Sequence, residues 1–169
     1  ASVRSIPATS VESAVASVLA GEFSTVSRPL LSVAGTDGER VRALFDLALV
    51  TAEPARISEY TVSNGDERVA TFRADGVVVA TPAGSHGYAR AAGAPVVAGT
   101  EPVAAIVPIA PFAIDTDQWI VAQEDVVLSV ERDEGSVSLL VDDRPAGTVD
   151  PAVPVRLSSG HELEILCPP

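Results

Sequence analysis

One stretch of this 169-residue sequence gathers residue types that bind phosphorylated ligands. Residues 73–95 read RADGVVVATPAGSHGYARAAGAP, in which the apolar run of residues 77–80 predicts a buried strand. Thr81-Pro82 follows the run, and Gly84-Ser85 opens a predicted short helix. The first N–H groups of a helix lack partners within it and carry partial positive charge. The stretch therefore predicts a place where an anion or a ribose phosphate binds.

Five residues of this stretch are candidate ligand contacts. Gly84 would let a ligand approach the backbone closely, and Ser85 could cap the helix and donate a hydrogen bond. Asp75 could accept hydrogen bonds from sugar hydroxyls or an amide, while His86 and Tyr88 add donors. A purely structural interpretation has about equal weight, since small residues also permit tight packing. The residues alone leave both interpretations open.

The elements around this stretch predict one domain over residues 1–169. Thr9 and Glu12 form a capping-box pair before an apolar repeat of helical spacing, and Gly21 is placed to end that helix, so residues 1–22 are a helical lead-in. Residues 83–94 predict a turn and a short helix. Ten strands are predicted over residues 28–33, 40–50, 57–62, 68–72, 77–80, 103–108, 126–132, 136–141, 154–157 and 162–166.

Turn signals separate these strands at residues 35–38, 63–66 and 133–135. Many short strands with frequent turns predict an all-β fold, a β-sandwich of antiparallel strands, with an N-terminal helix and one short inserted helix. Asp142-Asp143 is interpreted as a hairpin turn, and Trp119 as a packing residue at the edge of the sandwich or a platform for a nucleobase.

The composition limits the partners. The chain has 23 acidic residues against 11 basic ones, all of them Arg, and a formal net charge of −12. An acidic surface repels phosphate backbones and anionic lipid head groups, which disfavours nucleic acid and membrane partners. Either the protein is simply acidic, or it is adapted to a cytoplasm near molar salt, where screening reduces the self-repulsion. The absence of Lys favours salt adaptation.

The single cysteine, Cys167, cannot form a disulfide or a CxxC zinc site within one chain, and it fits a reducing, cytoplasmic setting. No metal ligand set is predicted. No apolar run reaches the roughly 18–20 residues that a membrane-spanning helix requires.

Residues 73–88 resemble the signature of the NAD kinase family, R-A-D-G-L-I-V-A-T-P-T-G-S-T-A-Y. The identical positions are Arg73, Ala74, Asp75, Gly76, Val79, Ala80, Thr81, Pro82, Gly84, Ser85 and Tyr88. Residues 19–23 (LAGEF) resemble the family's L-A-G-E-Y, residues 106–112 (IVPIAPF) its L-T-P-I-C-P-H, and residues 139–144 (LLVDDR) its L-S-I-D-G-Q. The resemblance thus spans nearly the whole chain.

The resemblance implies an all-β C-terminal domain that packs beside an N-terminal α/β domain. It implies NAD or NADP and ATP as ligands, Mg²⁺ if the protein is active, and a homodimer or homotetramer in which the dinucleotide site is partly shared between subunits. The implied nucleotide-binding residues are Asp75, Thr81, Gly84, Ser85, His86 and Tyr88, with Asp46 and Ala110 as further candidates.

The family's catalytic G-G-D-G loop is not among these 169 residues, and Gly35-Thr36-Asp37-Gly38 is interpreted as a plain turn. We therefore expect no catalytic residue in this chain and no activity from the chain alone. The family's Asn-Glu pair is replaced by Phe45-Asp46, its Thr-Ala pair by His86-Gly87. Three hypotheses stay open: part of a kinase that converts NAD to NADP with ATP or polyphosphate, a degenerate paralogue that acts as a nucleotide-binding regulatory module, and a structural or oligomerisation domain.

Overall fold

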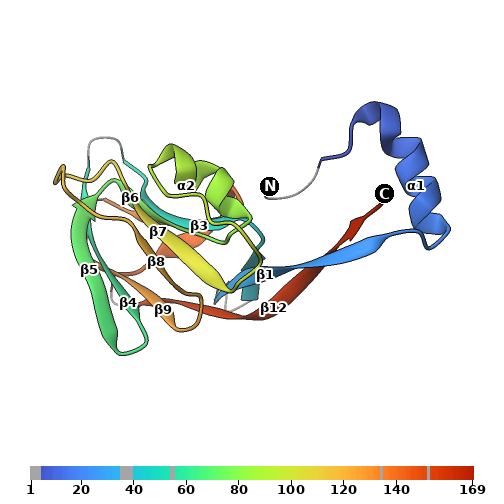
Figure 1. Ribbon diagram of the computed structural model, residues 1–169. Helices are drawn as coiled ribbons and strands as arrows, with labels where there is room; N and C mark the ends of the chain where they lie inside the picture. Colours follow the sequence, from blue (N-terminus) through green and yellow to red (C-terminus); the bar gives the residue numbers. More distant parts are fainter. Residues whose placement is uncertain (1–4, 35–39, 54–55, 134, 152) are drawn as a thin grey trace.

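The computed structural model describes residues 5–34, 40–53, 56–133, 135–151 and 153–169. They form two antiparallel six-stranded sheets with an arm that projects from one side (Figure 1). The predicted all-β sandwich is confirmed, as are the N-terminal helix and the short inserted helix.

The first sheet has the strand order β2-β1-β12-β9-β4-β5, and the second has the order β11-β10-β3-β6-β7-β8. The strands of the first sheet are β1 (Ser24–Ala34), β2 (Arg40–Ala43), β4 (Ser58–Asn64), β5 (Glu67–Ala74), β9 (Val126–Arg132) and β12 (Val155–Cys167). Those of the second are β3 (Asp46–Thr51), β6 (Gly76–Ala80), β7 (Val103–Ile109), β8 (Trp119–Ala122), β10 (Val137–Val141) and β11 (Arg144–Val149). The helices are η1 (Ala8–Ser10), α1 (Val11–Leu19), η2 (Gly84–His86) and α2 (Tyr88–Ala91).

Strand β6 shows how the apolar residues divide between two cores. Val77 and Val79 belong to the main core, which is built from both sheets, whereas Val78 and Ala80 belong to a smaller cluster that includes Ala89 of α2. Successive side chains of a strand point to opposite faces, so an unbroken apolar strand must be covered on both sides. The short helix α2 supplies that second cover, which holds the turn before it against the end of β6.

Helix α1 lies at the tip of the arm formed by β1 and β12 (Figure 1). Gly21, with a φ of 78°, follows its last turn; the N–H of Gly21 donates to the Val18 carbonyl and that of Glu22 to the Ser17 carbonyl. These two hydrogen bonds are the pattern of a helix that ends at a glycine, as predicted. The predicted start differs, because Ser10 occupies the cap position and no side chain caps the helix there.

Three of the strand predictions are wrong in their connections. The predicted strand over residues 40–50 is two strands, β2 and β3, which belong to different sheets. Strands β9 and β10 also belong to different sheets, so they do not form a hairpin with each other. The last two predicted strands are one long strand, β12, which continues through Gly160 at a φ of 95°. The turn predicted over residues 35–38 lies outside the described residues.

The break between β2 and β3 has a clear physical cause. The Asp142 carboxylate accepts three successive backbone N–H groups, from Leu44 and Phe45 at 2.8 Å each and from Asp46 at 3.1 Å. These N–H groups are thereby withdrawn from strand pairing. The chain turns at this point and passes from one sheet to the other.

The same loop is bonded on its other side to the turn that follows β6. The Thr81 N–H donates to the Phe45 carbonyl at 2.9 Å, and the Thr81 hydroxyl donates to the Leu44 carbonyl at 2.6 Å. The Gly84 N–H in turn donates to the Thr81 hydroxyl at 3.1 Å. A Cβ atom on Gly84 would lie 1.8 Å from the Phe45 carbonyl oxygen. The close backbone approach that the sequence predicts for a ligand is therefore made here by Phe45.

We expect Gly84→Ala to lower the free energy of unfolding by about 3 kcal/mol, the upper end of the usual range for overpacking, because two backbone segments must separate. Chemical denaturation of both proteins checks this. The exposed Ala91 of α2 offers the control Ala91→Ser, which also adds one heavy atom and should change stability by less than about 0.5 kcal/mol. Equal stability of Gly84→Ala and the unmodified chain would contradict the tight contact.

Candidate functional site

Three loops surround a cleft with a volume of about 980 Å³. They are the β2–β3 connection, the turn that contains η2, and the hairpin between β10 and β11. The cleft is lined by Val41, Arg42, Phe45, Asp46, Ala83, Gly84, His86, Gly87, Tyr88, Val141, Asp142, Asp143, Arg144, Pro145, Ala146 and Gly147. The volume lies at the upper end of the range for small-molecule sites.

Asp46 is the most deeply placed acid of this cleft, with only 8% of its surface exposed. Burial raises the pKa of its carboxyl to about 6, and the nearby charges of Asp143 and Asp142 add to the rise. A carboxyl that titrates near neutral pH can donate or accept a hydrogen bond according to its protonation state. Asp46 is therefore the group of the cleft best suited to exchange a proton or to bind a hydroxyl.

The turn after β6 presents some of its predicted site residues to the cleft and keeps others inside. His86 and Tyr88 line the cleft, and Tyr88 is 41% exposed. Ser85 is buried; its hydroxyl donates to the Pro82 carbonyl at 2.8 Å and accepts the Val97 N–H at 2.9 Å. Thr81 is equally buried and bonded to the β2–β3 connection. The hydroxyls of Thr81 and Ser85 thus shape the turn from within.

Asp75 and Ala110 lie at the opposite end of β6. Asp75 precedes the strand, where its N–H donates to the Ile109 carbonyl at 3.0 Å, and Ala110 follows directly with a φ of 45°. Asp75 and Thr81 are six positions apart, which is about 20 Å along a strand. The eight predicted site residues therefore divide into two groups that one chain does not bring together: Asp75 and Ala110 at one end, and the rest around or beneath the cleft.

Sequence reasoning missed the contribution of the β10–β11 hairpin to the cleft. Asp142 and Asp143 form the predicted two-residue turn, with φ values of 46° and 63°, and Val141 pairs with Arg144 across it. This turn also delivers the Asp142 carboxylate to the β2–β3 connection. In the sequence, a pair of Asp residues between two strands indicates only a turn. The backbone N–H groups that the Asp142 carboxylate binds lie almost 100 positions earlier in the chain.

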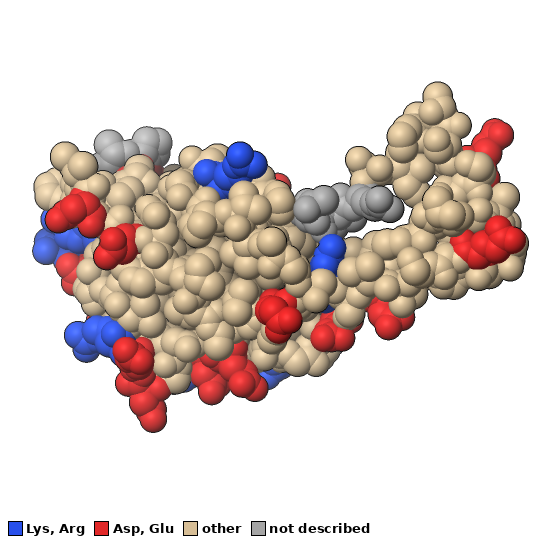
Figure 2. Space-filling model, in the orientation of Figure 1, with Lys and Arg blue, Asp and Glu red and all other residues tan. Residues whose placement is uncertain are grey.

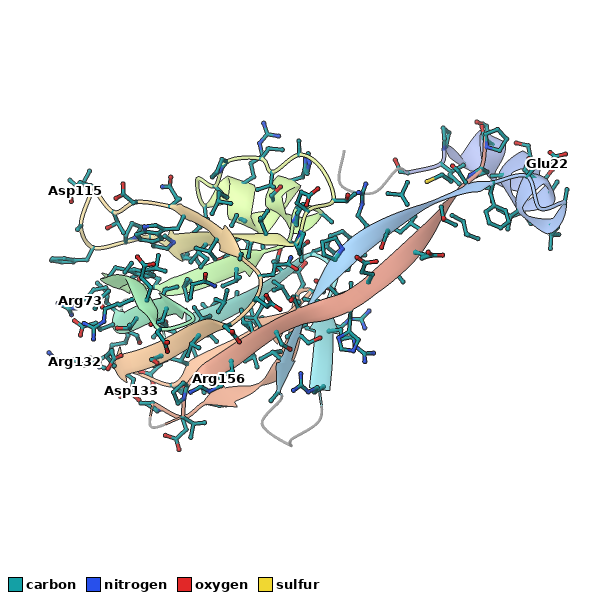
Figure 3. All side chains as sticks on the ribbon, turned by 60° about the horizontal axis from the view of Figure 1, so that its bottom comes forward. Glu22, Arg73, Asp115, Arg132, Asp133 and Arg156 are labelled. Carbon is teal, nitrogen blue, oxygen red and sulfur yellow. The ribbon has the colours of Figure 1, made fainter. Side chains whose placement is uncertain are left out.

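The far end of the sandwich, where β5 meets β6, carries exposed apolar side chains. Phe112 is 69% exposed and Ile114 is fully exposed. The Arg73 guanidinium lies over the Phe112 ring, 5.5 Å from its centre. Arg73 and Asp115 are labelled at this end in Figure 3, away from the arm. Trp119 stacks on Phe72 at 5.8 Å, as the packing interpretation predicts.

Acidic groups outnumber basic ones on the face shown in Figure 2, along the lower edge of the sandwich and on the arm. Within the described residues, no group of three or more His, Cys, Asp or Glu side chains is arranged to hold a metal ion. None of the described helices has the length and apolar character needed to cross a membrane.

The raised pKa of Asp46 predicts a specific pH dependence. Because the folded-state pKa lies above the ordinary value of 3.8, the folded chain holds this proton more tightly than the unfolded chain. The resulting stabilisation is complete below about pH 4 and is lost as the pH rises through about 6. We expect Asp46→Asn to be more stable than the unmodified chain at pH 7 and to lose this advantage near pH 4.

Urea denaturation at half-unit pH intervals measures the difference between the two proteins. Asp133→Asn, which removes the same charge from an exposed position, should show no such change across this pH range. A constant difference between Asp46→Asn and the unmodified chain would show that Asp46 is ionised normally in the folded state.

Comparison with known proteins agrees with this architecture. Residues 45–166 match the family model of the ATP-NAD kinase C-terminal domain. The NAD kinase of Methanothermobacter thermautotrophicus is 39% identical over 117 residues, which are 69% of this chain and 41% of that protein. The NAD kinase of Gemmatimonas aurantiaca is 30% identical over 164 residues, 94% of this chain and 54% of that protein.

Two solved structures have the same fold. Yeast NADH kinase complexed with NADH superimposes with a TM-score of 0.81 at 19% identity, over 94% of this chain and 49% of that one. An NAD kinase from Archaeoglobus fulgidus in complex with ATP gives a TM-score of 0.73 at 26% identity, over 88% of this chain and 56% of that one. The chain thus spans about half the length of the relatives it matches. It belongs to the NAD kinase family and corresponds to the C-terminal domain of that family.

Proposed function

We propose that this chain is the dinucleotide-binding part of an NAD kinase, which transfers a phosphoryl group from ATP or polyphosphate to NAD. The observation that carries the proposal is the cleft itself: Gly84 and Tyr88 of the family signature line it together with the buried Asp46. The relatives named above are NAD kinases, and of the two solved structures the yeast enzyme holds NADH and the Archaeoglobus fulgidus enzyme holds ATP. Phosphoryl transfer relies mainly on positioning and on stabilisation of charge, so a domain that holds the acceptor is an essential part of such an enzyme.

Mg²⁺, if the full enzyme requires it, would be held mainly by the phosphates of ATP and by water. The donor set of the described residues supports that view, because two of the three acids of the cleft have other roles: the Asp142 oxygens accept backbone N–H groups, and Asp46 has a raised pKa. The acidic surface favours an origin in a salt-rich cytoplasm. That setting remains a prediction from composition.

We also propose that the complete dinucleotide site forms between two copies of the chain. Asp75 and Ala110 lie about 20 Å from the cleft of their own chain, which is too far for one nicotinamide or ribose to contact both ends. The exposed Phe112 and Ile114 beside them are apolar groups of the kind that subunit interfaces cover. A two-fold dimer that packs this end of each copy against the cleft of the other would bring Asp75 of one copy to the cleft of its partner.

A thermal-shift titration of the chain with NAD, NADP and ATP in about 2 M KCl tests these proposals. At 100 times the dissociation constant a ligand stabilises by about 2.7 kcal/mol, or roughly 5–10 °C for a chain of this size. We expect a saturable rise with NAD or NADP that is lost on Asp75→Ala and on Tyr88→Ala and is kept on Asp133→Ala. No response to any dinucleotide, in this chain or in a longer form of the protein, would favour the degenerate or structural alternatives.

Mixing the two variants that no longer bind the dinucleotide distinguishes a site shared between two copies from a site within one copy. If Asp75 and Tyr88 belong to the same site on different copies, random dimers of Asp75→Ala with Tyr88→Ala should recover about a quarter of the sites. Binding measured by calorimetry on the refolded mixture checks this. No recovery, with dimers confirmed by sedimentation, would place both residues in one copy.

The arm presents a second apolar surface. Among the described residues of α1 none is buried, and Val11, Val15 and Leu19 are 47%, 52% and 84% exposed. Leu163 and Leu166 of β12 are exposed nearby on the arm. We propose that this surface packs against the additional domain that the longer relatives contain, because a helix with no core of its own needs a partner.

We expect Leu19→Ser to change the stability of the 169-residue chain by less than about 0.5 kcal/mol, and to lower that of a longer form of the protein by about 1.5–3 kcal/mol. Denaturation of both forms measures this, with Glu22→Gln as the control on the same exposed tip (Figure 3). A small effect in both forms would show that the arm stays uncovered.

A further inference from the structure

One of the smaller cavities, with a volume of about 120 Å³, lies on the other side of the turn that lines the cleft. It is lined by Arg28 of β1, by Pro82, Ala83 and His86 of the turn, and by residues 96–99. Sites for drug-sized ligands have volumes of about 300–1,000 Å³, so this cavity fits only a small group. None of the described residues that line it is acidic, although acids outnumber basic residues two to one in the chain.

The Arg28 side chain has an unmet bonding requirement at this cavity. Its Nε–H is shielded from solvent and has no hydrogen-bond partner among the described residues. The salt bridge found among those residues joins Arg56 to Glu53 and does not involve Arg28. A guanidinium group stays charged in proteins, and an N–H donor that is shielded from water and has no acceptor lowers the stability of the fold. The fold therefore keeps a cation at this cavity with bonding capacity left over.

His86 links this cavity to the main cleft. It is half-buried and lines both spaces, so this residue forms part of the wall between them. The family signature has Thr at this position, whereas the imidazole of His86 offers a ring N–H that can donate a hydrogen bond to an anion. Arg28 and His86 thus bring two groups that favour anions to one cavity.

We propose that Arg28 and His86 form a binding site for a tetrahedral oxyanion, a phosphate or a terminal phosphoryl group. Guanidinium groups bind phosphate with charge-assisted, often paired hydrogen bonds, and a shift of the Arg28 side chain toward the cavity on binding would let its Nε–H form one of them. The anion is either free phosphate or the terminal phosphate of a ligand that extends from the cleft past His86. This proposal rests on the cavity and stands apart from dinucleotide binding in the cleft.

Titration with 0–20 mM potassium phosphate in about 2 M KCl, followed by thermal shift and by NMR of ¹⁵N-labelled arginine, tests the site. We expect a saturable rise in melting temperature and a shift of one arginine Nε–H signal. Arg28→Gln should weaken phosphate binding about tenfold or more and remove that signal, because it deletes the charge and the paired donors. His86→Asn should weaken binding less, and Arg156→Gln, which removes an exposed charge, should leave it unchanged.

A rise in melting temperature that never saturates and is the same in every variant would be the general effect of phosphate on protein hydration and would overturn the proposal. So would a titration in which no arginine Nε–H signal moves, and this readout on the unmodified chain holds even if Arg28→Gln fails to fold. Competition experiments identify the source of the anion. If NADP or ATP displaces bound phosphate and NAD does not, the site binds the phosphate group of a larger ligand. If none of the three displaces it, the site binds free phosphate. NAD titration of Arg28→Gln reports separately on the cleft.

Discussion

The Asp142 carboxylate, bonded to three successive N–H groups at residues 44–46, is the interaction on which the candidate site depends. A charged acceptor forms stronger hydrogen bonds than a neutral one, and these three replace the strand pairing that the loop gives up. They orient the Leu44 and Phe45 carbonyls toward Thr81, and Thr81 in turn holds the Gly84 N–H. The Asp142 carboxylate and the Thr81 hydroxyl, together with the bond from the Thr81 N–H to the Phe45 carbonyl, thus join the three walls of the cleft.

Local sequence patterns predicted most elements of this fold, missed the strands β8 and β11 at the two edges of the second sheet, and predicted the connections poorly. Gly21 after an apolar helical repeat, and Gly65 between β4 and β5, are determined by the backbone angles that these positions need, so the sequence alone reveals them. The division of residues 40–51 between two sheets depends on a carboxylate almost 100 residues away. The chain also passes from β9 in the first sheet to β10 in the second, and this passage depends on which face of each strand is buried in the core. Neither leaves a signature in the local pattern.

The same distinction applies to the site. The signature containing Gly84 and Tyr88 selected a turn that lines the cleft, and its glycines and small residues are required by close backbone contacts that the turn makes itself. It could not separate groups that face the cleft from groups such as Ser85 that are bonded inside the fold. Nor could it place Asp75 at the far end of β6, since neighbours in a sequence motif are easily taken for neighbours in space. Arg28 and its cavity carried no sequence signal at all.

The position of β12 has a consequence for how the chain folds. In the first sheet this strand lies between β1 and β9, so Ser24 pairs with Cys167 across nearly the whole length of the chain. Until residues 155–167 have been synthesised, β2-β1 and β9-β4-β5 are two separate fragments, each with an unpaired edge. Contacts so distant in sequence form late and slowly. During synthesis, the first sheet therefore has two unpaired strand edges until β12 has been made. In that interval the chain is most prone to pair with another chain and aggregate.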